Sequence, residues 1–402
     1  MTSIRIQAID HIDEIDPARW DALVEDCGGS VMLKHAFLRA FETSSSVAPG
    51  TGWQTSHLLL WEQTPASPDR VNTSADASSS ERTEHLVAAI PLYAKRHSYG
   101  EFVFDWAWAE AYERHGLKYY PKWLCAVPFT PVPGPRLLTT APYRPQAAKA
   151  LLHWAEMSKL SSLHVLYTSD EDTQTLRKAG CMTRTHTQFH WFNQNWQNFD
   201  SFLTDLNQSK RKKIRAERRK VKDAGVTTQV ITGDALTQEH WDFFYRCYAN
   251  TYHLRGNQPY LTPAFFSEVG RTLPGHCVLA LAYRGTEPIA ASLLWLDTAQ
   301  GQRRLYGRYW GTLEHVDCLH FELAYYTPIE WALNNQIDVI EGGAQGEHKL
   351  ARGFIPVQTQ SAHWLAHPGF ADAVDRYLEQ ERAGINAYTE SLHSPFKQEI
   401  GD

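Results

Sequence analysis

Hydrophobic residues along the chain fall alternately into short continuous runs, which predict buried strands, and into helical spacing, which predicts amphipathic helices. One helix should begin at Asp16-Pro17, because aspartate caps helices and proline suits the first helical position, and it should end at Gly28. In the first half the pattern further predicts helices at about 34–42 and 146–158 and a short one ending at Gly180, with strands at 4–9, 57–61, 86–93, 102–106, 164–167 and 189–192.

Two segments of the first half interrupt this pattern. Residues 63–84 are polar, rich in Ser, Thr and Pro, and without aromatic residues, so we expect a disordered hairpin tip there. Five prolines between Pro121 and Pro135 force an extended path. An ordered loop of this kind usually covers a core or forms the wall of a binding site.

A strongly basic helix is predicted between the two halves. Asp200 should cap it and Gly225 should end it, and its apolar positions form only a thin stripe. From Lys210 to Lys222 it holds nine Lys and Arg residues against one Glu. A solvated linker helix, a contact for tRNA or another phosphate-bearing ligand, and a membrane-surface patch are the three interpretations. The candidate phosphate contacts are Lys210, Arg211, Lys213, Arg215 and Arg218.

The stretch from Gln336 to Phe354 holds the densest set of candidate functional residues. It is typical of a buried strand, a glycine-rich turn and a short basic helix that Gly353 ends. Side chains that follow such a strand face the crevice where α/β folds bind ligands. Glu341, Glu347 and His348 are candidates for proton transfer, His348 foremost because the imidazole pKa lies near neutrality. Ordinary surface charge on a strand–helix connection is the competing interpretation.

Other residues are candidates for substrate contacts. Lys349 and Arg352 lie three apart on the short helix and so share a face that suits a phosphate or carboxylate. Tyr306 and Arg308 lie two apart on the preceding strand and should point the same way. No Ser-His-Asp order and no metal-ligand spacing is evident, so we expect no metal. Candidates for lining an acceptor groove in the first half are Asp105, Lys122, Thr130 and Arg136.

The two halves can be laid on each other. In both, the predicted elements follow the order β, α, α, β, β, β, α, β, α, β, which suggests a duplicated domain. The segment EFVFDWAW of the first half matches RLYGRYWG of the second, and each half has a tryptophan-containing helix that leads into a strand. We expect an N-terminal domain at 1–197, a basic connector at 198–225 and a C-terminal domain at 226–402.

Charge and composition narrow the class of protein. The chain has 402 residues, natural for two domains, and its net charge of −6 excludes a general polyanion binder. Its six cysteines are scattered and fit a reducing compartment. The acidic N-terminus lacks the apolar core of a signal peptide, and no stretch is long and apolar enough to span a membrane. We therefore expect a cytoplasmic protein.

The element order resembles that of the GNAT acyltransferase unit, and two such units in tandem resemble the Fem-type transferases. The similarity is closest to a bacterial group of Fem-like predicted N-acyltransferases, on the stretches FVFDWAWAEAYERHGLKYYPK, AVPFTPVPGPRLL, SKRKKIRAERRKV and EGGAQGEHKLARGF. The resemblance implies an α+β fold with two tandem GNAT-like units, each a mixed, mostly antiparallel sheet flanked by helices. It also favours phosphate contact for the basic helix, because Fem-type proteins carry a similar segment.

The resemblance implies a donor of activated acyl groups and an amine acceptor. A conventional GNAT unit binds the pyrophosphate of acyl-CoA with Q/R-x-x-G-x-G/A between its fourth strand and the next helix. Here Leu313 replaces the last small residue of the stretch that begins at Arg308, which hinders close approach of the backbone to a phosphate. Fem-type proteins, which pass an amino acid from aminoacyl-tRNA to a peptidoglycan-precursor peptide, also lack a clean CoA loop.

We therefore expect an N-acyltransferase that transfers an aminoacyl or acyl group directly to an amine of a peptide-like or cell-wall-related acceptor. Its donor would be aminoacyl-tRNA or acyl-CoA, with no tightly bound cofactor. The alternatives are an acyl-CoA-dependent N-acetyltransferase acting on a small amine, and a degenerate member that only binds its ligand. The first-half counterpart of the 336–354 stretch lacks the EGGAQGEH cluster, so we expect any active site to lie in the second half.

Overall fold

The computed structural model describes residues 3–64, 83–299, 301–344 and 346–397. Most of the expected hairpin tip, residues 65–82, lies outside the described residues. The helices are α1 (Pro17–Asp26), α2 (His35–Thr43), α3 (Trp106–Arg114), α4 (Arg144–Ser158), α5 (Asp170–Lys178), α6 (Phe199–Asp205), α7 (Gln208–Asp223), α8 (Gln238–His253), α9 (Pro263–Thr272), α10 (Leu319–Phe321), α11 (Thr327–Asn334) and α12 (Pro368–Ser391). The strands are β1 (Ser3–Ile9), β2 (Trp53–Thr55), β3 (His57–Thr64), β4 (Thr83–Ile90), β5 (Leu92–Lys95), β6 (Lys122–Cys125), β7 (Leu138–Thr139), β8 (Ser162–Thr168), β9 (Met182–Phe192), β10 (Val226–Thr232), β11 (Cys277–Arg284), β12 (Glu287–Ala299), β13 (Gln302–Thr312), β14 (Val339–Glu341) and β15 (Ile355–Leu365).

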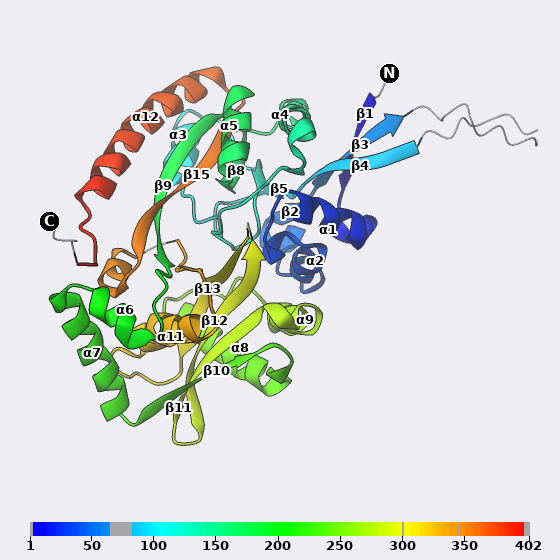
Figure 1. Cartoon of the computed structure of the whole chain (residues 1–402). Helices are drawn as coiled ribbons and strands as arrows, with labels where there is room; N and C mark the ends of the chain where they lie inside the picture. The colour runs from blue at the N-terminus through cyan, green and yellow to red at the C-terminus, as the bar shows by residue number, and fades with distance from the viewer. Residues whose placement is uncertain (1–2, 65–82, 300, 345, 398–402) are drawn as a thin grey trace, which may run out of the picture.

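An eleven-stranded sheet runs through the molecule in the order β10-β11-β12-β13-β14-β9-β15-β8-β6-β5-β2 (Figure 1). Its strand pairs are antiparallel except β13 with β14 and β6 with β8. Strand β9 of the first half pairs with β14, and β15 of the second half pairs with β8, so the halves exchange a strand. A smaller sheet, β1-β3-β4-β7, lies beside it.

This order confirms the expected fold class, α+β with mixed, mostly antiparallel sheets flanked by helices. It also has the symmetry that a duplication predicts. From either end an antiparallel run leads to one parallel pair and then to a strand of the other half. The expected domain boundaries at 197 and 225 stay a prediction, because the exchanged strands carry the sheet across both.

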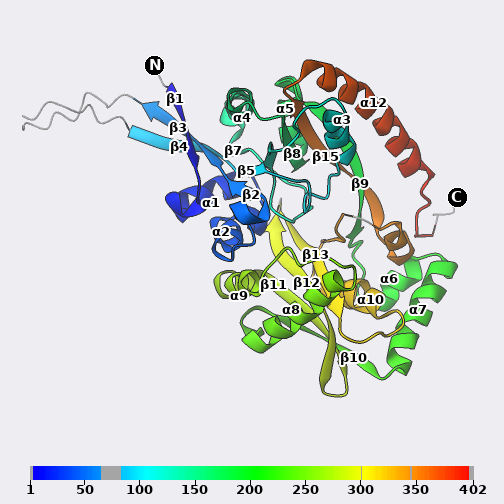
Figure 2. The ribbon, with the colours of Figure 1, turned by 180° about the vertical axis from the view of Figure 1, so that it is seen from behind.

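Helices cover both faces of the second-half strands (Figure 2), and an apolar core lies under each layer of helices. On one side, the α8 face, α8 and α9 pack with α2 of the first half, where Phe41 stacks on Phe265 at 4.5 Å between ring centres. On the other side, the α11 face, α6, α7 and α11 pack against Leu305 and Ile340. Each such buried side chain stabilises the fold by about 1.5–3 kcal/mol. Because strand side chains alternate, Tyr306 faces α8 while Leu305 faces α11.

Two sequence expectations are wrong in detail. Residues 102–106 do not form a strand: Phe102 has a positive φ of 61°, which is outside the extended region, and α3 begins at Trp106. The basic helix is two helices, α6 and α7, because Asn198 and Asn207 each cap a new helix through their side chains. The short basic helix at Glu347–Arg352 is a 3-10 helix.

Gly311, which matched the first glycine of the acyl-CoA loop, has a different role. It pairs with Ala291 inside β13, and a β-carbon there would lie 1.9 Å from the carbonyl oxygen of Cys247 on α8. Glycine is therefore required for α8 to pack on the sheet.

We predict that Gly311→Ala lowers the free energy of unfolding by about 3 kcal/mol, because overpacking displaces a helix. Gly50→Ala is the control, since no atom lies within 4 Å of its added β-carbon, and we expect it to change stability by less than about 0.5 kcal/mol. Thermal unfolding of the three proteins measures both. Unchanged stability in Gly311→Ala would contradict the packing explanation.

Candidate active site

The second half has a fork in its sheet, at the carboxyl ends of β13 and β14. The two strands pair only from Arg304 to Tyr306 and from Val339 to Glu341, and β13 continues alone beside β12. A bulge follows at once, where Arg308 is left without a partner on β12. Bulges bend a strand and increase its twist, so β13 turns away from β14 here.

A pocket of about 500 Å³, the fork pocket, opens at this point. Tyr248 and Tyr252 of α8 line it on one face of the sheet, and Tyr325 and His348 line it on the other. Gly307 and Gly342, the first residues beyond the paired segment, lie between them. The pocket thus extends through the fork from one face of the sheet to the other.

The fork pocket is basic and aromatic. Its charged or titratable nitrogen groups come from Arg255, Arg308, His320, His348 and Lys349, and none of its lining residues is an aspartate or glutamate. Arg308 lies over the ring of Tyr309, with 4.9 Å from guanidinium carbon to ring centre, and donates to the carbonyl of Phe129. Arg308 thus ties the proline-rich loop to the fork. A pocket of this kind suits an anionic ligand with an apolar part.

His348 and Glu347, adjacent in sequence, have different surroundings. His348 Nε2 lies 3.0 Å from the hydroxyl of Tyr325 in the fork pocket. Burial, Arg352 and Lys349 lower the pKa of His348, so the imidazole is neutral at neutral pH. Glu347 is exposed and accepts a 3.3 Å hydrogen bond from Tyr388 of α12. Of these two proton-transfer candidates, only His348 lines the fork pocket.

Lys349 and Arg352 are both buried, with different partners. The Lys349 amine donates to Gly343 O at 3.0 Å, and burial lowers its pKa to about 7. A β-carbon at Gly342 would lie 3.0 Å from the lysine stem, so the glycine turn is shaped around it. Arg352 is bound to Glu217 of α7 at 2.9 Å and lies over a phenylalanine ring. Lys349 faces the fork pocket, whereas Arg352 joins the 3-10 helix to α7.

A second hollow, the inter-half cavity, adjoins the fork. It measures about 260 Å³ and is lined by both halves, with Arg304, Tyr306 and Glu341 on the second-half side. Tyr306 and Arg308 were expected to point the same way. The bulge separates them, so Tyr306 lines this cavity and Arg308 the fork pocket. Glu341 and Gly342, consecutive residues, likewise belong to the cavity and the pocket.

Polar atoms without a partner gather in the inter-half cavity. Glu341 Oε2, Arg304 Nε and Thr359 Oγ1 are buried with no hydrogen-bond partner among the described residues. The other oxygen of Glu341 accepts from Arg304 at 2.9 Å, and His190 Nε2 lies 3.9 Å from Oε2. Burial raises the pKa of Glu341 to about 7 and lowers that of His190 to about 3. Unsatisfied buried groups are rare, so several in one cavity indicate a place for water or ligand.

The matching fork of the first half is filled by protein. Strands β6 and β8 pair only as far as Cys125 and Val165. Just beyond, the Arg136 guanidinium donates to Leu166 O at 2.8 Å and to Val132 O at 2.7 Å. Thr130 bonds to a neighbouring carbonyl of the same proline-rich loop. Both candidate acceptor contacts are therefore buried and bonded within the protein.

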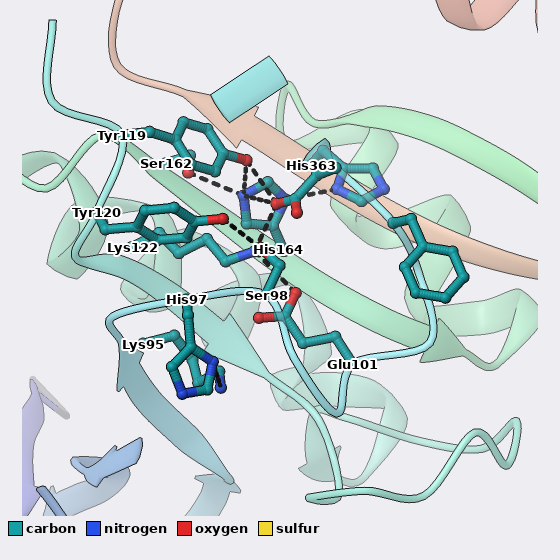
Figure 3. Close-up of polar contacts among 12 residues, drawn as sticks. Lys95, His97, Ser98, Glu101, Tyr119, Tyr120, Lys122, Ser162, His164 and His363 are labelled. Atoms are coloured by element: carbon teal, nitrogen blue, oxygen red, sulfur yellow. Dashed lines mark hydrogen bonds and ion pairs between the residues drawn. The ribbon is translucent and has the colours of Figure 1, made fainter. Parts of the chain in front are cut away.

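Lys122 lies in a buried polar cluster (Figure 3). Asp105 belongs to the same cluster. The Lys122 amine donates to Glu101 at 2.7 Å, to Ser98 at 2.8 Å and to Asp105. Asp105 also accepts from Tyr119, which lies 3.0 Å from His164. Burial raises the pKa of Glu101 to about 7, while Lys122 holds that of Asp105 well below its usual value. One lysine is thus shared by two carboxylates inside the protein.

The candidate phosphate contacts on α7 differ in exposure. Arg218 bonds to Glu322 and Glu330 and lies over the ring of Phe199, so it holds α7 against its neighbours. Lys213 and Arg215 are exposed. Lys213 is close enough to His348 to lower the pKa of that imidazole. Lys210 and Arg211 are half-buried at the start of the helix.

Several site residues escaped the sequence analysis. Arg304 lies two residues before Tyr306, so the same strand alternation could have found it. Tyr325, on a π-helical turn, and Arg255, just beyond α8, gave no comparable signal. His190 and Thr359 reach the cavity from the exchanged strands β9 and β15, and only the tertiary pairing brings them there.

Solved structures of low sequence identity match the chain, and two of them, FemX and L-PGS, share its fold. FemX is 12% identical, with 90% of this chain and 98% of that chain covered and a TM-score of 0.50. L-PGS from Bacillus licheniformis is 9% identical, with 90% and 97% covered and a TM-score of 0.51. A tandem GNAT protein from the clavulanic acid biosynthesis pathway is 11% identical, with 91% and 99% covered and a TM-score of 0.45.

No curated protein matches the chain by sequence. No helix among the described residues is long and apolar enough to cross a membrane. A family model described as peptidoglycan biosynthesis/recognition matches residues 11–398, nearly the whole length. With the fold and the sequence match in agreement, the chain belongs to the FemAB-like family of Fem-type acyltransferases.

Proposed function

We propose that this protein is an N-acyltransferase that passes an aminoacyl or acyl group from a donor in the fork pocket to an amine in the inter-half cavity. The observation that carries the proposal is the fork itself. The consecutive residues Glu341 and Gly342 line the cavity and the pocket respectively, so two substrates could meet at one strand end. Holding both reactants in place is a large part of catalysis of such a transfer.

The proposed reaction is a direct displacement. The acceptor nitrogen attacks the acyl carbonyl, the new C–N bond forms, and the bond to the thiol or ribose hydroxyl of the donor breaks. The Glu341 carboxylate takes the proton that the amine loses, because its free oxygen is aimed into the cavity. On the α11 face, the Tyr325 hydroxyl, 3.0 Å from Nε2 of the neutral His348, donates a proton to the leaving thiolate or ribose oxygen, and solvent replaces that proton as Glu341 releases its own. Lys349 and Arg308 supply positive charge for the donor.

The acceptor is proposed to be an amine of a peptide-like or cell-wall-related molecule, in keeping with the family description. Acetylation of a small amine from acyl-CoA is the second candidate function, and ligand binding without catalysis is the third. All six cysteines are unpaired, and we place the reaction in the cytoplasm, where thiols stay reduced.

We predict that Glu341→Gln lowers kcat/KM by about 10²–10⁴-fold, the usual contribution of a general base. Because a base must be ionised to act and the pKa of Glu341 is about 7, wild-type kcat/KM should rise with pH through about 7. That limb should vanish in the variant. Glu347→Gln is the matched comparison and should keep both rate and profile. Loss of activity in Glu347→Gln alone would reverse the assignment.

The contacts between the donor and the fork pocket are tested at Arg255, an exposed residue that lines this pocket. Arg255→Glu should raise the donor KM on the order of tenfold, and more at low salt, because it places a negative charge at an anion site. Arg246→Glu, on the outer side of α8, is the control and should leave KM unchanged. Steady-state kinetics at two ionic strengths give the answer. Equal effects of the two substitutions would exclude an anionic donor in the fork pocket.

Variants of the basic helix α7 distinguish aminoacyl-tRNA from acyl-CoA as the donor. Reversal of the exposed charges in Lys213→Glu/Arg215→Glu should raise the KM for aminoacyl-tRNA more than tenfold and flatten its salt dependence. The KM for acyl-CoA should change by a smaller factor, because CoA carries fewer phosphates than tRNA and makes fewer contacts with the helix. The assay compares alanyl-tRNA with acetyl-CoA. Turnover of acetyl-CoA but not of alanyl-tRNA by the wild type would favour the second candidate.

A further inference from the structure

The segment between β5 and α3 alternates between two environments although it is not a strand. Glu101, Val103 and Asp105 are 2–4% exposed, whereas Phe104 is 49% exposed. The inward residues include two carboxylates, which rarely enter a core without partners. The outward residues, Phe102 and Phe104, both line the fork pocket. We call these two phenylalanines the aromatic rim.

Lys122 holds the inward side of this segment. Its amine lies between Glu101 and the Tyr119–His164 pair (Figure 3) and bonds to both Glu101 and Asp105. All three side chains are buried. Removal of one partner from such a group leaves uncompensated charge in the interior and costs several kcal/mol. The two ends of the segment are therefore fixed to one point on β6.

The outward residues, Phe102 and Phe104, are also held through their backbone carbonyls. Phe102 O accepts from the Tyr167 hydroxyl at 3.1 Å, and Phe104 O accepts from Arg184 at 2.7 Å. Phe102 has a positive φ of 61°, a strained conformation for a phenylalanine that its surroundings must maintain. The Arg308 guanidinium lies 6.0 Å from the Phe102 ring. The Phe102 ring packs against the edge of the core on the α8 face, and the Phe104 ring is half-exposed at the pocket.

We propose that Lys122 is a positioning residue for the fork pocket: by holding Glu101 and Asp105 it places the aromatic rim over the acyl group of the bound donor, and the rim sets which acyl groups are accepted. A half-exposed phenylalanine gains burial when an apolar group lies against it. The rim lies on the first half while the donor pocket belongs to the second, so the first half takes part in choosing the acyl group. The presence of an acyl donor in the fork pocket is part of the proposed function, and this inference rests on it.

The test compares acyl-group preference in variants of the rim and of its support. The donors are alanyl-tRNA and phenylalanyl-tRNA, with acetyl-CoA and octanoyl-CoA as the thioester pair. Phe104→Ala should lower the ratio of kcat/KM for the larger over the smaller acyl group on the order of tenfold, because the larger group loses more apolar contact. Tyr99→Ala removes an exposed aromatic residue from the same loop, but outside the fork pocket, and should leave the ratio unchanged.

The positioning role of Lys122 is tested with Lys122→Met. The shape-conserving Glu101→Gln is a second variant, in case Lys122→Met fails to fold. Either should shift the same ratio in the direction of Phe104→Ala while kcat for the preferred donor changes less than KM. Hydrogen exchange should rise at residues 100–105. A merely structural role would lower stability without moving the ratio, and a folded variant with wild-type preference would overturn the proposal.

Failure of the proposed function would look different. The wild type would then consume none of the four donors, whereas hydrogen exchange still reports on the support. Unchanged exchange at residues 100–105 in both Lys122→Met and Glu101→Gln would overturn the inference regardless of activity. Faster exchange confined to that segment would support it.

Discussion

The early parting of β13 and β14 is the constraint on which the functional part of this protein depends. Parallel strands that stay paired leave no room between them, whereas a bulge at Arg308 ends the pairing after three residues. The gap joins the two faces of the sheet and places Glu341 beside it. Helix α8 can cover the gap closely because Gly311 lets its backbone approach the strand.

Burial then divides the chemistry between the two sides of the fork. In the inter-half cavity burial raises the pKa of Glu341 to about 7, so the carboxylate can take and release a proton near neutral pH. In the fork pocket burial lowers the pKa of Lys349 to about 7, in surroundings without a carboxylate. Desolvation therefore has two effects. It makes Glu341 a proton acceptor on one side of the fork, and it brings the loss of the Lys349 charge into the neutral pH range on the other.

The two halves differ at their parted strand pairs, and this difference places the proposed site in the second half. Both halves have a parallel strand pair that parts, but in the first half Arg136 and the proline-rich loop occupy the gap. The loop then reaches the other fork, where Phe129 accepts from Arg308. Exchange of β9 and β15 brings His190 and Thr359 into the inter-half cavity. The first half has thus become a wall and a support for the site of the second.

The sequence by itself determined most of the elements, because caps, glycines and apolar spacing act locally: Asp16 begins α1, and Gly353 ends the 3-10 helix. It also predicted a candidate site in the stretch around Glu341 and His348, two residues that line the inter-half cavity and the fork pocket. The apolar pattern missed a local signal at Asn207, whose side chain caps α7 three residues on. It failed at residues 102–106, where Phe102 has a positive φ and the neighbouring carboxylates bind Lys122 on a distant strand. Which candidates face a pocket was decided only by the tertiary structure, because strand exchange, a bulge and burial set side-chain direction and charge, and none of these is encoded within a few residues.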